Sequence, residues 1–156
     1  MTASSAPTAV TNLLAAINAQ SAVTTPVPGY ALGVIRGAPL DDQPIDEAIV
    51  IRNVRRTVVR FEATGTSTPI RGALREDFTI PVEVFVFRGG DDAVAVETRW
   101  WALVAAVEAA VMADRTLAGA VIDAWPEASD FTSEWDDESH GRRAIGTVHV
   151  NCWNTN

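Results

Sequence analysis

The chain of 156 residues, with a mass of 16.7 kDa, is the size of one domain, large enough to bury about 68 to 70% of its unfolded surface. Twelve basic and twenty acidic residues give a formal net charge of -8, which argues against a protein that binds duplex DNA through contacts to phosphate. The lone Cys152 cannot form an internal disulfide, so nothing indicates a disulfide-stapled secreted scaffold.

The first twenty residues predict an amphipathic helix. Ser5 is placed to cap it, and Pro7 falls in a first turn that tolerates proline. Its longest wholly apolar run, 13–17, is too short to span a membrane, and no targeting signal precedes it. The apolar residues recur at the helical spacing i, i+3, i+4, i+7: Val10, Leu13, Leu14 and Ile17.

Strands are expected next. Prolines and a glycine predict an extended segment over 21–30, because proline disfavours helix for itself and its predecessor. A strand over 30–36 and a second over 47–52 follow, and the second is expected to continue through 57–61 across a bulge near Asn53. The polar, glycine-bearing segment around 62–77 predicts a long surface loop or a splayed hairpin end.

The segment 78–87 predicts a third strand with one buried face, since its even positions are all apolar. Pro81 indicates an edge strand, or a strand that begins unpaired. A helix then starts at Asp91 or Asp92 and ends near Asp114. Its buried stripe is expected to be Val96, Trp100, Leu103, Val104, Val107 and Val111.

Trp101 falls on the flank of that helix. It is expected either to pack at the edge of its own sheet or to anchor an interface with another protein. The chain then continues with a fourth strand after DRTLAGAVIDAW, an acidic loop around 127–141 and a fifth strand over 143–153. The predicted fold class is therefore α+β: a mixed, mainly antiparallel sheet of about 4–5 strands, packed by an N-terminal helix and one long central helix, in one domain over 1–156.

No motif indicates catalysis or cofactor binding. His149 and Cys152 lie three residues apart on a predicted strand, on opposite faces, and so cannot share a metal ion. The neighbouring Ser, His and Asp of SEWDDESHG lack the separated elements of a nucleophilic triad, and no glycine-rich phosphate loop occurs. We expect no catalytic residue, no metal and no cofactor.

Two groups of charged residues remain. Every basic residue is an arginine, and six of the twelve fall between residues 52 and 75. The other group is the acidic loop. Each group is either solvated surface or one side of a repeated head-to-tail contact between subunits, which closes into a ring when the rotation permits. The candidate interface residues are Arg52, Arg55, Arg56, Arg60, Arg71 and Arg75, with Glu134, Asp136 and Asp137 of the acidic loop, and Trp101.

The order of these elements resembles that of the tail terminator proteins of long-tailed phages, especially phages of actinobacteria. The resemblance covers nearly the whole chain and is a pattern of order and spacing. Its most characteristic piece is the long helix leading to Thr116, Leu117, Gly119 and Val121, followed by a final strand after Gly-Arg-Arg.

The resemblance implies a virion protein that forms a ring, expected to be a hexamer, at the head-proximal end of the tail tube. Such a ring stops tube polymerisation, joins tail to neck and lets DNA pass without specific binding. Its partners would be copies of itself, the tail tube protein and the neck protein, with no membrane. Alternatives are a neck or head-tail connector, a monomeric binding module, or a small enzyme that uses carboxylates of the acidic loop.

Overall fold

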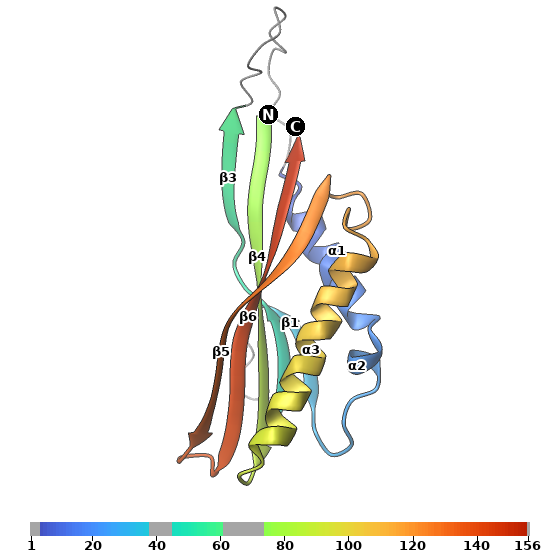
Figure 1. Cartoon of the computed structure of the whole chain (residues 1–156). Coiled ribbons are helices and arrows are strands. Elements are labelled where there is room, and N and C mark those ends of the chain that lie inside the picture. The colour runs from blue at the N-terminus through green and yellow to red at the C-terminus, as the bar shows by residue number, and fades with distance from the viewer. Residues whose placement is uncertain (1–3, 38–44, 61–73, 156) are drawn as a thin grey trace, which may run out of the picture.

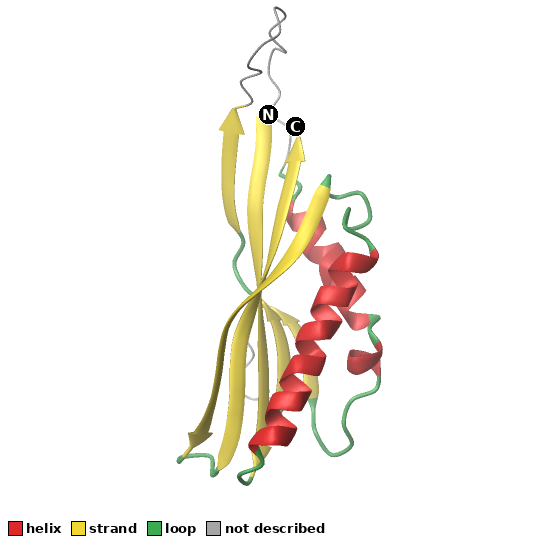
Figure 2. Cartoon of the chain, viewed as in Figure 1, coloured by secondary structure: helices red, strands yellow, loops and turns green. Residues whose placement is uncertain are grey.

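The computed structural model describes residues 4–37, 45–60 and 74–155 (Figure 1). Three helices lie against one face of a six-stranded, strongly twisted sheet (Figure 2). The helices are α1 (Ala6–Asn18), α2 (Ser21–Thr24) and α3 (Ala93–Ala113). The strands are β1 (Leu32–Arg36), β2 (Glu47–Ile51), β3 (Arg55–Arg60), β4 (Leu74–Gly89), β5 (Asp123–Asp136) and β6 (Gly141–Thr155).

The sheet has the order β1-β2-β4-β6-β5, and β3 pairs with β4 beyond the end of β2. The pair β1 and β2 is parallel, and all other pairs are antiparallel. The predicted α+β class with a mixed, mainly antiparallel sheet is confirmed. The sheet has one strand more than the 4–5 expected, because the predicted second strand is interrupted over 52–54 and becomes β2 and β3.

Pro81 lies in a central strand, so the expectation of an edge position or an unpaired start was wrong. Its carbonyl accepts a hydrogen bond of 2.8 Å from the backbone N–H of Arg52. In an antiparallel strand a residue's N–H and C=O point to the same side. The backbone N–H that proline lacks would therefore have pointed at the interruption between β2 and β3, where no strand carbonyl needs a donor.

Other expectations need correction at the ends of elements. Residues 21–24 form the short helix α2 where an extended segment was expected. Of the predicted loop around 62–77, residues 74–77 begin β4, where β3 and β6 pair with them; residues 61–73 lie outside the described part of the chain. The acidic segment is also a strand as far as Asp136, followed by a turn at 137–140.

The reason is that β6 supplies partners for the acidic segment: Glu134 pairs with Arg143, and Asp136 with Gly141. A β-bulge at Asp130, which has a φ of 52°, separates two halves of β5. Before the bulge the odd-numbered residues of β5 face away from the helices. After it they face the helices, which brings Phe131 to the ring of Trp100, with ring centres 4.6 Å apart.

The expected core residues are buried. All five even positions of the third predicted strand and the six-residue stripe of the long helix are at most 3% exposed. The N-terminal helix buries Val10, Leu13 and Ile17 as expected, whereas Leu14 is only partly buried against the core. The carboxylate of Asp92 accepts from the N–H of Ala95, which confirms the predicted cap of α3.

Trp100 is the largest fully buried side chain. It is 1% exposed, and its Nε1–H donates to the carbonyl of Val84 at 2.9 Å. Its ring lies over Gly146, where an added Cβ would come within 2.5 Å of the ring and 2.2 Å of the carbonyl oxygen of Asp130. Because Gly146 has no side chain, it leaves room in β6 for both the ring of Trp100 and the bulge of β5.

Replacing Trp100 with alanine should lower the free energy of unfolding by about 3 to 5 kcal/mol, because it leaves a cavity and removes the hydrogen bond to the carbonyl of Val84. Trp101→Ala should cost less, since Trp101 is 51% exposed. Chemical denaturation of both variants measures this. Equal losses of unfolding free energy in the two variants would contradict the difference in burial between the two rings.

Gly146→Ala should be destabilising by about 1 to 3 kcal/mol or more, because the added methyl group meets backbone and an aromatic ring. Gly89→Ala is the matched control in β4, where an added Cβ has no neighbour within 4 Å among the described residues. Thermal unfolding of the pair measures the difference. A Gly146 variant as stable as the Gly89 variant would refute the packing of Trp100 on β6.

Candidate interaction surface

The sheet has one covered and one open face. The helices cover the face with the even-numbered residues of β4 and β6 (Figure 2). No helix of the described residues covers the opposite face, whose side chains are mostly half-buried. We call this opposite face the open face; it carries Pro81, Phe85 and Phe87 of β4 and Ile145 and His149 of β6.

Three of the four arginines between 52 and 75 whose side chains the structure describes are paired within the chain. Arg52 contacts Glu83 at 2.6 Å, Arg75 contacts Asp77 at 2.7 Å, and Arg56 is paired with Glu76. The carboxylates that balance them come from β4, which strand pairing brings beside β2 and β3 although they are distant in sequence. Arg55 is exposed, the side chain of Arg60 is not described, and Arg71 lies outside the described residues.

The acidic residues are also engaged within the chain. Arg143 contacts Glu134 at 2.6 Å and Asp136 at 3.9 Å, and Asp137 accepts a hydrogen bond of 2.8 Å from Nε1 of Trp135. The acidic turn lies beside the end of β4, whereas β3 pairs with its start, so the two groups of charges occupy opposite ends of the sheet (Figure 1). This separation is compatible with a head-to-tail contact, which stays a prediction.

At the arginine end, the open face has a shallow hollow of about 310 Å³. Arg55, Arg75 and Trp125 line it together with Asp77 and Asn151. The guanidinium of Arg75 also lies 5.1 Å from the centre of the ring of Trp153, within the range of a cation–π contact. Aromatic and arginine side chains are enriched in protein interfaces, and here they share one end of the open face.

The outward side of α3 is the clearest exposed apolar surface. Its nine exposed residues are all uncharged, and Thr98 is the only polar one among them. Val94 is 74%, Trp101 51% and Met112 56% exposed. We call this the outer face of α3; it comprises Val94, Ala95, Thr98, Trp101, Ala102, Ala105, Ala109, Met112 and Ala113.

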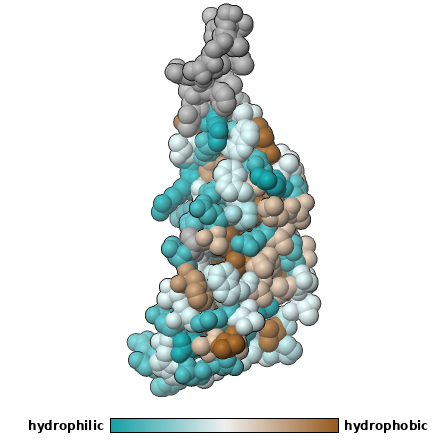
Figure 3. Space-filling model, viewed as in Figure 1, coloured by the Kyte–Doolittle hydropathy of each residue, from teal (hydrophilic) through white to brown (hydrophobic). Residues whose placement is uncertain are grey.

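In Figure 3, apolar residues in brown and tan follow the line that α3 takes in Figure 1. Trp101 packs on Trp100 and Phe131, with ring centres 4.7 and 5.6 Å apart, yet half of it is exposed. Its role as an interface anchor stays a prediction. The alanines of the outer face went unnoticed in the sequence. The signal was available, since only Glu97, Arg99 and Glu108 of the 21 residues in this helix are charged, whereas a surface helix normally carries charged residues along its outer side.

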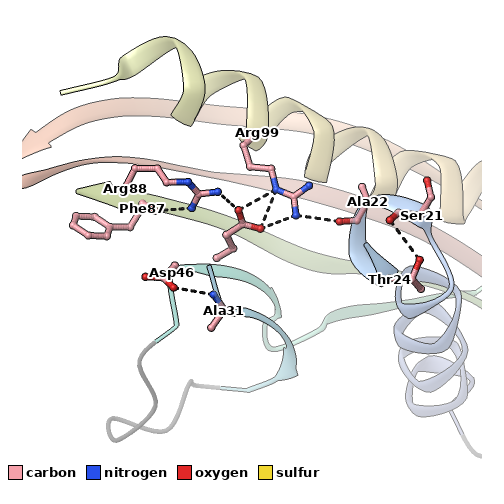
Figure 4. Close-up of polar contacts among 9 residues, drawn as sticks. Ser21, Ala22, Thr24, Ala31, Asp46, Phe87, Arg88 and Arg99 are labelled. Atoms are coloured by element: carbon pink, nitrogen blue, oxygen red, sulfur yellow. Dashed lines mark hydrogen bonds and ion pairs between the residues drawn. The ribbon is translucent and has the colours of Figure 1, made fainter. Parts of the chain in front are cut away.

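The position of α3 on the sheet is fixed by a buried carboxylate (Figure 4). Glu47 of β2 is fully buried and accepts from Arg99 of α3, with 2.7 Å between Nη2 and Oε2, and from Arg88 of β4. Arg99 also donates to the carbonyl of Ala22 at 3.0 Å, and the guanidinium of Arg88 lies 3.6 Å from the centre of the ring of Tyr30. Burial raises the pKa of Glu47, but hydrogen bonds from the two arginines outweigh it and hold the pKa below its usual value.

A second buried carboxylate fixes the start of α1. Ser5 precedes the helix as expected, but its side chain does not cap it. Its hydroxyl and backbone N–H instead donate to Glu76 of β4 at 2.9 and 3.1 Å, and Ser4 and Arg56 donate to the other oxygen. Burial acts to raise the pKa of Glu76, but these hydrogen bonds favour the charged form more and lower it to about 2.

The turn after α3 contains Leu117, Ala118 and Gly119, which all have positive φ. The carboxylate of Asp114 holds it by accepting from the N–H groups of Thr116 and Ala118 at 2.9 and 2.7 Å. The hydrogen bond from the Thr116 hydroxyl is the main cause that lowers the pKa of Asp114. Leu117 is 2% exposed, so the turn inserts a core side chain between α3 and β5.

The described residues contain no group of three or more His, Cys, Asp or Glu placed to hold a metal ion. None of the helices in that part of the chain combines the length and apolar character needed to cross a membrane. His149 and Cys152 face opposite sides of β6, as expected. A scan against models of protein families finds no match, and a search of curated proteins finds none either.

The low pKa of Glu76 predicts a loss of stability in acid. Its stabilisation is fully present above the usual pKa of 4.5 and disappears as pH falls toward about 2, a change on the order of 3 kcal/mol. The difference in unfolding free energy between wild type and Glu76→Gln should therefore shrink over this pH range. Urea denaturation from pH 7 to pH 2 measures it, with exposed Glu138→Gln as control. A difference independent of pH would contradict the assignment.

Proposed function

We propose that this protein is a structural subunit that forms a ring, a hexamer of about 100 kDa from six copies of 16.7 kDa, on the head-proximal end of a phage tail tube. The ring covers the top of the tube and stops its growth. It also offers the neck a different surface, so that the head can be joined. Its partners are copies of itself, the tube protein and the neck protein.

The observation that carries the proposal is that the nine exposed residues of α3 are all uncharged, and that its charged residues Glu97, Arg99 and Glu108 are only partly exposed. A helix that works alone in water carries charged residues on its outer side. The open face of the sheet likewise lacks a covering layer among the described residues. Both surfaces favour a subunit of an assembly over a monomeric binding module, and the order of elements that resembles tail terminators indicates which assembly.

Charge supports the same proposal. A terminating ring must let DNA pass without holding it, and non-specific affinity for DNA comes from Lys and Arg contacts to phosphate. Eight arginines of this chain take part in ion pairs with its own carboxylates. With a net charge of -8, the purified protein should show no measurable affinity for duplex DNA at physiological salt.

Phage produced without the protein should carry tails of abnormal length that fail to join heads, because nothing covers the growing end of the tube. Electron microscopy of the particles, with measured tail lengths, tests this. Complementation with the wild-type chain is the control. Tails of normal length that remain unattached would instead identify a neck connector, and normal infectious particles would refute both functions.

A further inference from the structure

We infer that the hollow beside the first half of α3 binds a small organic molecule that carries one carboxylate group, with Arg99 as the donor. The hollow lies between α3, the end of β4 and the segment that joins α2 to β1. Its volume is about 590 Å³, within the range of sites that hold small molecules. The inference goes beyond the ring proposed above and does not depend on it.

The arginines of the hollow carry one more charge than their carboxylate balances. Arg88 and Arg99 both line the hollow, and their side chains are only 8% and 12% exposed. Both pair with the single carboxylate of Glu47, and no other carboxylate in the described part of the chain forms an ion pair with them. A guanidinium is always charged, and a charge shielded from water needs a counter-ion. One positive charge therefore remains for an anion from outside the chain.

Arg99 also has a donor that the chain does not use. Its Nε and Nη2 donate to Glu47, and Nη2 donates to the carbonyl of Ala22 at 3.0 Å. Nη1 makes no hydrogen bond to a described residue, and Figure 4 draws no dashed line to one terminal nitrogen of Arg99. It is not buried either, because the Oγ of Ser133 is the only buried side-chain N or O without a partner among the described residues. Nη1 therefore reaches solvent, where a carboxylate would accept a charge-assisted hydrogen bond from it.

Both guanidiniums are held in place before a ligand arrives. Arg99 meets both oxygens of Glu47, which fixes the plane of its guanidinium. Arg88 is held by Glu47, by the carbonyl of Phe87 at 2.7 Å and by the ring of Tyr30, whose centre is 3.6 Å away. A donor that is already fixed loses little conformational entropy on binding.

The carboxylate of Asp92 lines the hollow as well and limits the charge of the ligand. Asp92 is exposed and accepts from the N–H of Ala95 at 2.9 Å, so it caps α3 and faces the positive end of the helix dipole. It forms no ion pair with either arginine in the described structure, so it does not neutralise their excess charge. It would repel a second negative charge on a ligand. This favours a carboxylate over a phosphate group, which carries about -1.5 to -2 at pH 7.

The rest of the hollow accommodates an apolar body. Ala95 and Ala102 lie two turns apart on α3 and line the hollow together with Val27. Thr98 is exposed between the two alanines and adds a hydroxyl donor. Small side chains leave this space open, and apolar ligand surface placed there is removed from water. The hollow therefore suits an aromatic or aliphatic acid, for which benzoate is a simple probe.

Titration with benzoate at pH 7 tests the site. In ¹⁵N-labelled protein, the Nε–H resonance of Arg99 should shift in a saturable way, with a dissociation constant of about 1 mM or lower. Acetate, which lacks the apolar body, and inorganic phosphate, which carries more charge, should bind more weakly. Arg99→Lys keeps a positive charge beside Glu47 but lacks Nη1; it identifies the resonance by its loss and should not bind benzoate in a calorimetric titration.

A pair of variants locates the site. Ala102→Phe fills the hollow and should raise the dissociation constant of benzoate about tenfold or more. Ala109→Phe, at an exposed alanine two turns further along α3, is the matched control and should leave it unchanged. Thermal unfolding without ligand verifies that both variants fold, and this pair decides alone if Arg99→Lys does not fold. Equal effects of the two variants, or a shift that does not saturate, would overturn the site. Tighter binding of phosphate than of benzoate would overturn the carboxylate as its ligand.

Discussion

The buried carboxylate of Glu47 is the constraint on which the arrangement of helices and sheet depends. A charge this deep in the protein needs partners with good geometry, and removing one of them would leave it uncompensated. Its partners come from β4 and α3, so the pairing sets how far α3 lies along the sheet and how it is rotated. With that rotation fixed, Trp100 faces Gly146 and the alanines face outward.

Much of the fold could be predicted from local pattern. Period-two alternation identified the buried face of β4, and helical spacing identified the buried stripe of α3, because both depend only on neighbouring residues. Pairings between distant segments were not predictable in this way. The carboxylates that neutralise Arg52 and Arg56 lie twenty residues or more along the chain, and Glu134 and Asp136 form a strand only because β6 is beside them.

The candidate surface was predictable in part. Trp101 was recognised because a single aromatic residue at a flank is conspicuous, whereas the exposed alanines drew no notice because each is unremarkable by itself. What marks them is the absence of charge along one whole side of a helix, which becomes visible only when the side facing the core is known. Arg71 and the side chain of Arg60 lie outside what the structure describes, so their part in the surface stays a prediction.

Pro81 has a consequence for the specificity of strand pairing. In the observed alignment its missing donor lies opposite the gap between β2 and β3. If β2 slipped along β4, a strand carbonyl would face the proline ring and lose its hydrogen bond, and a slip by one residue would also turn the apolar side chains of β2 to the wrong face. The proline thus favours the observed register of β2 and β3 on β4 and disfavours misregistered pairing during folding.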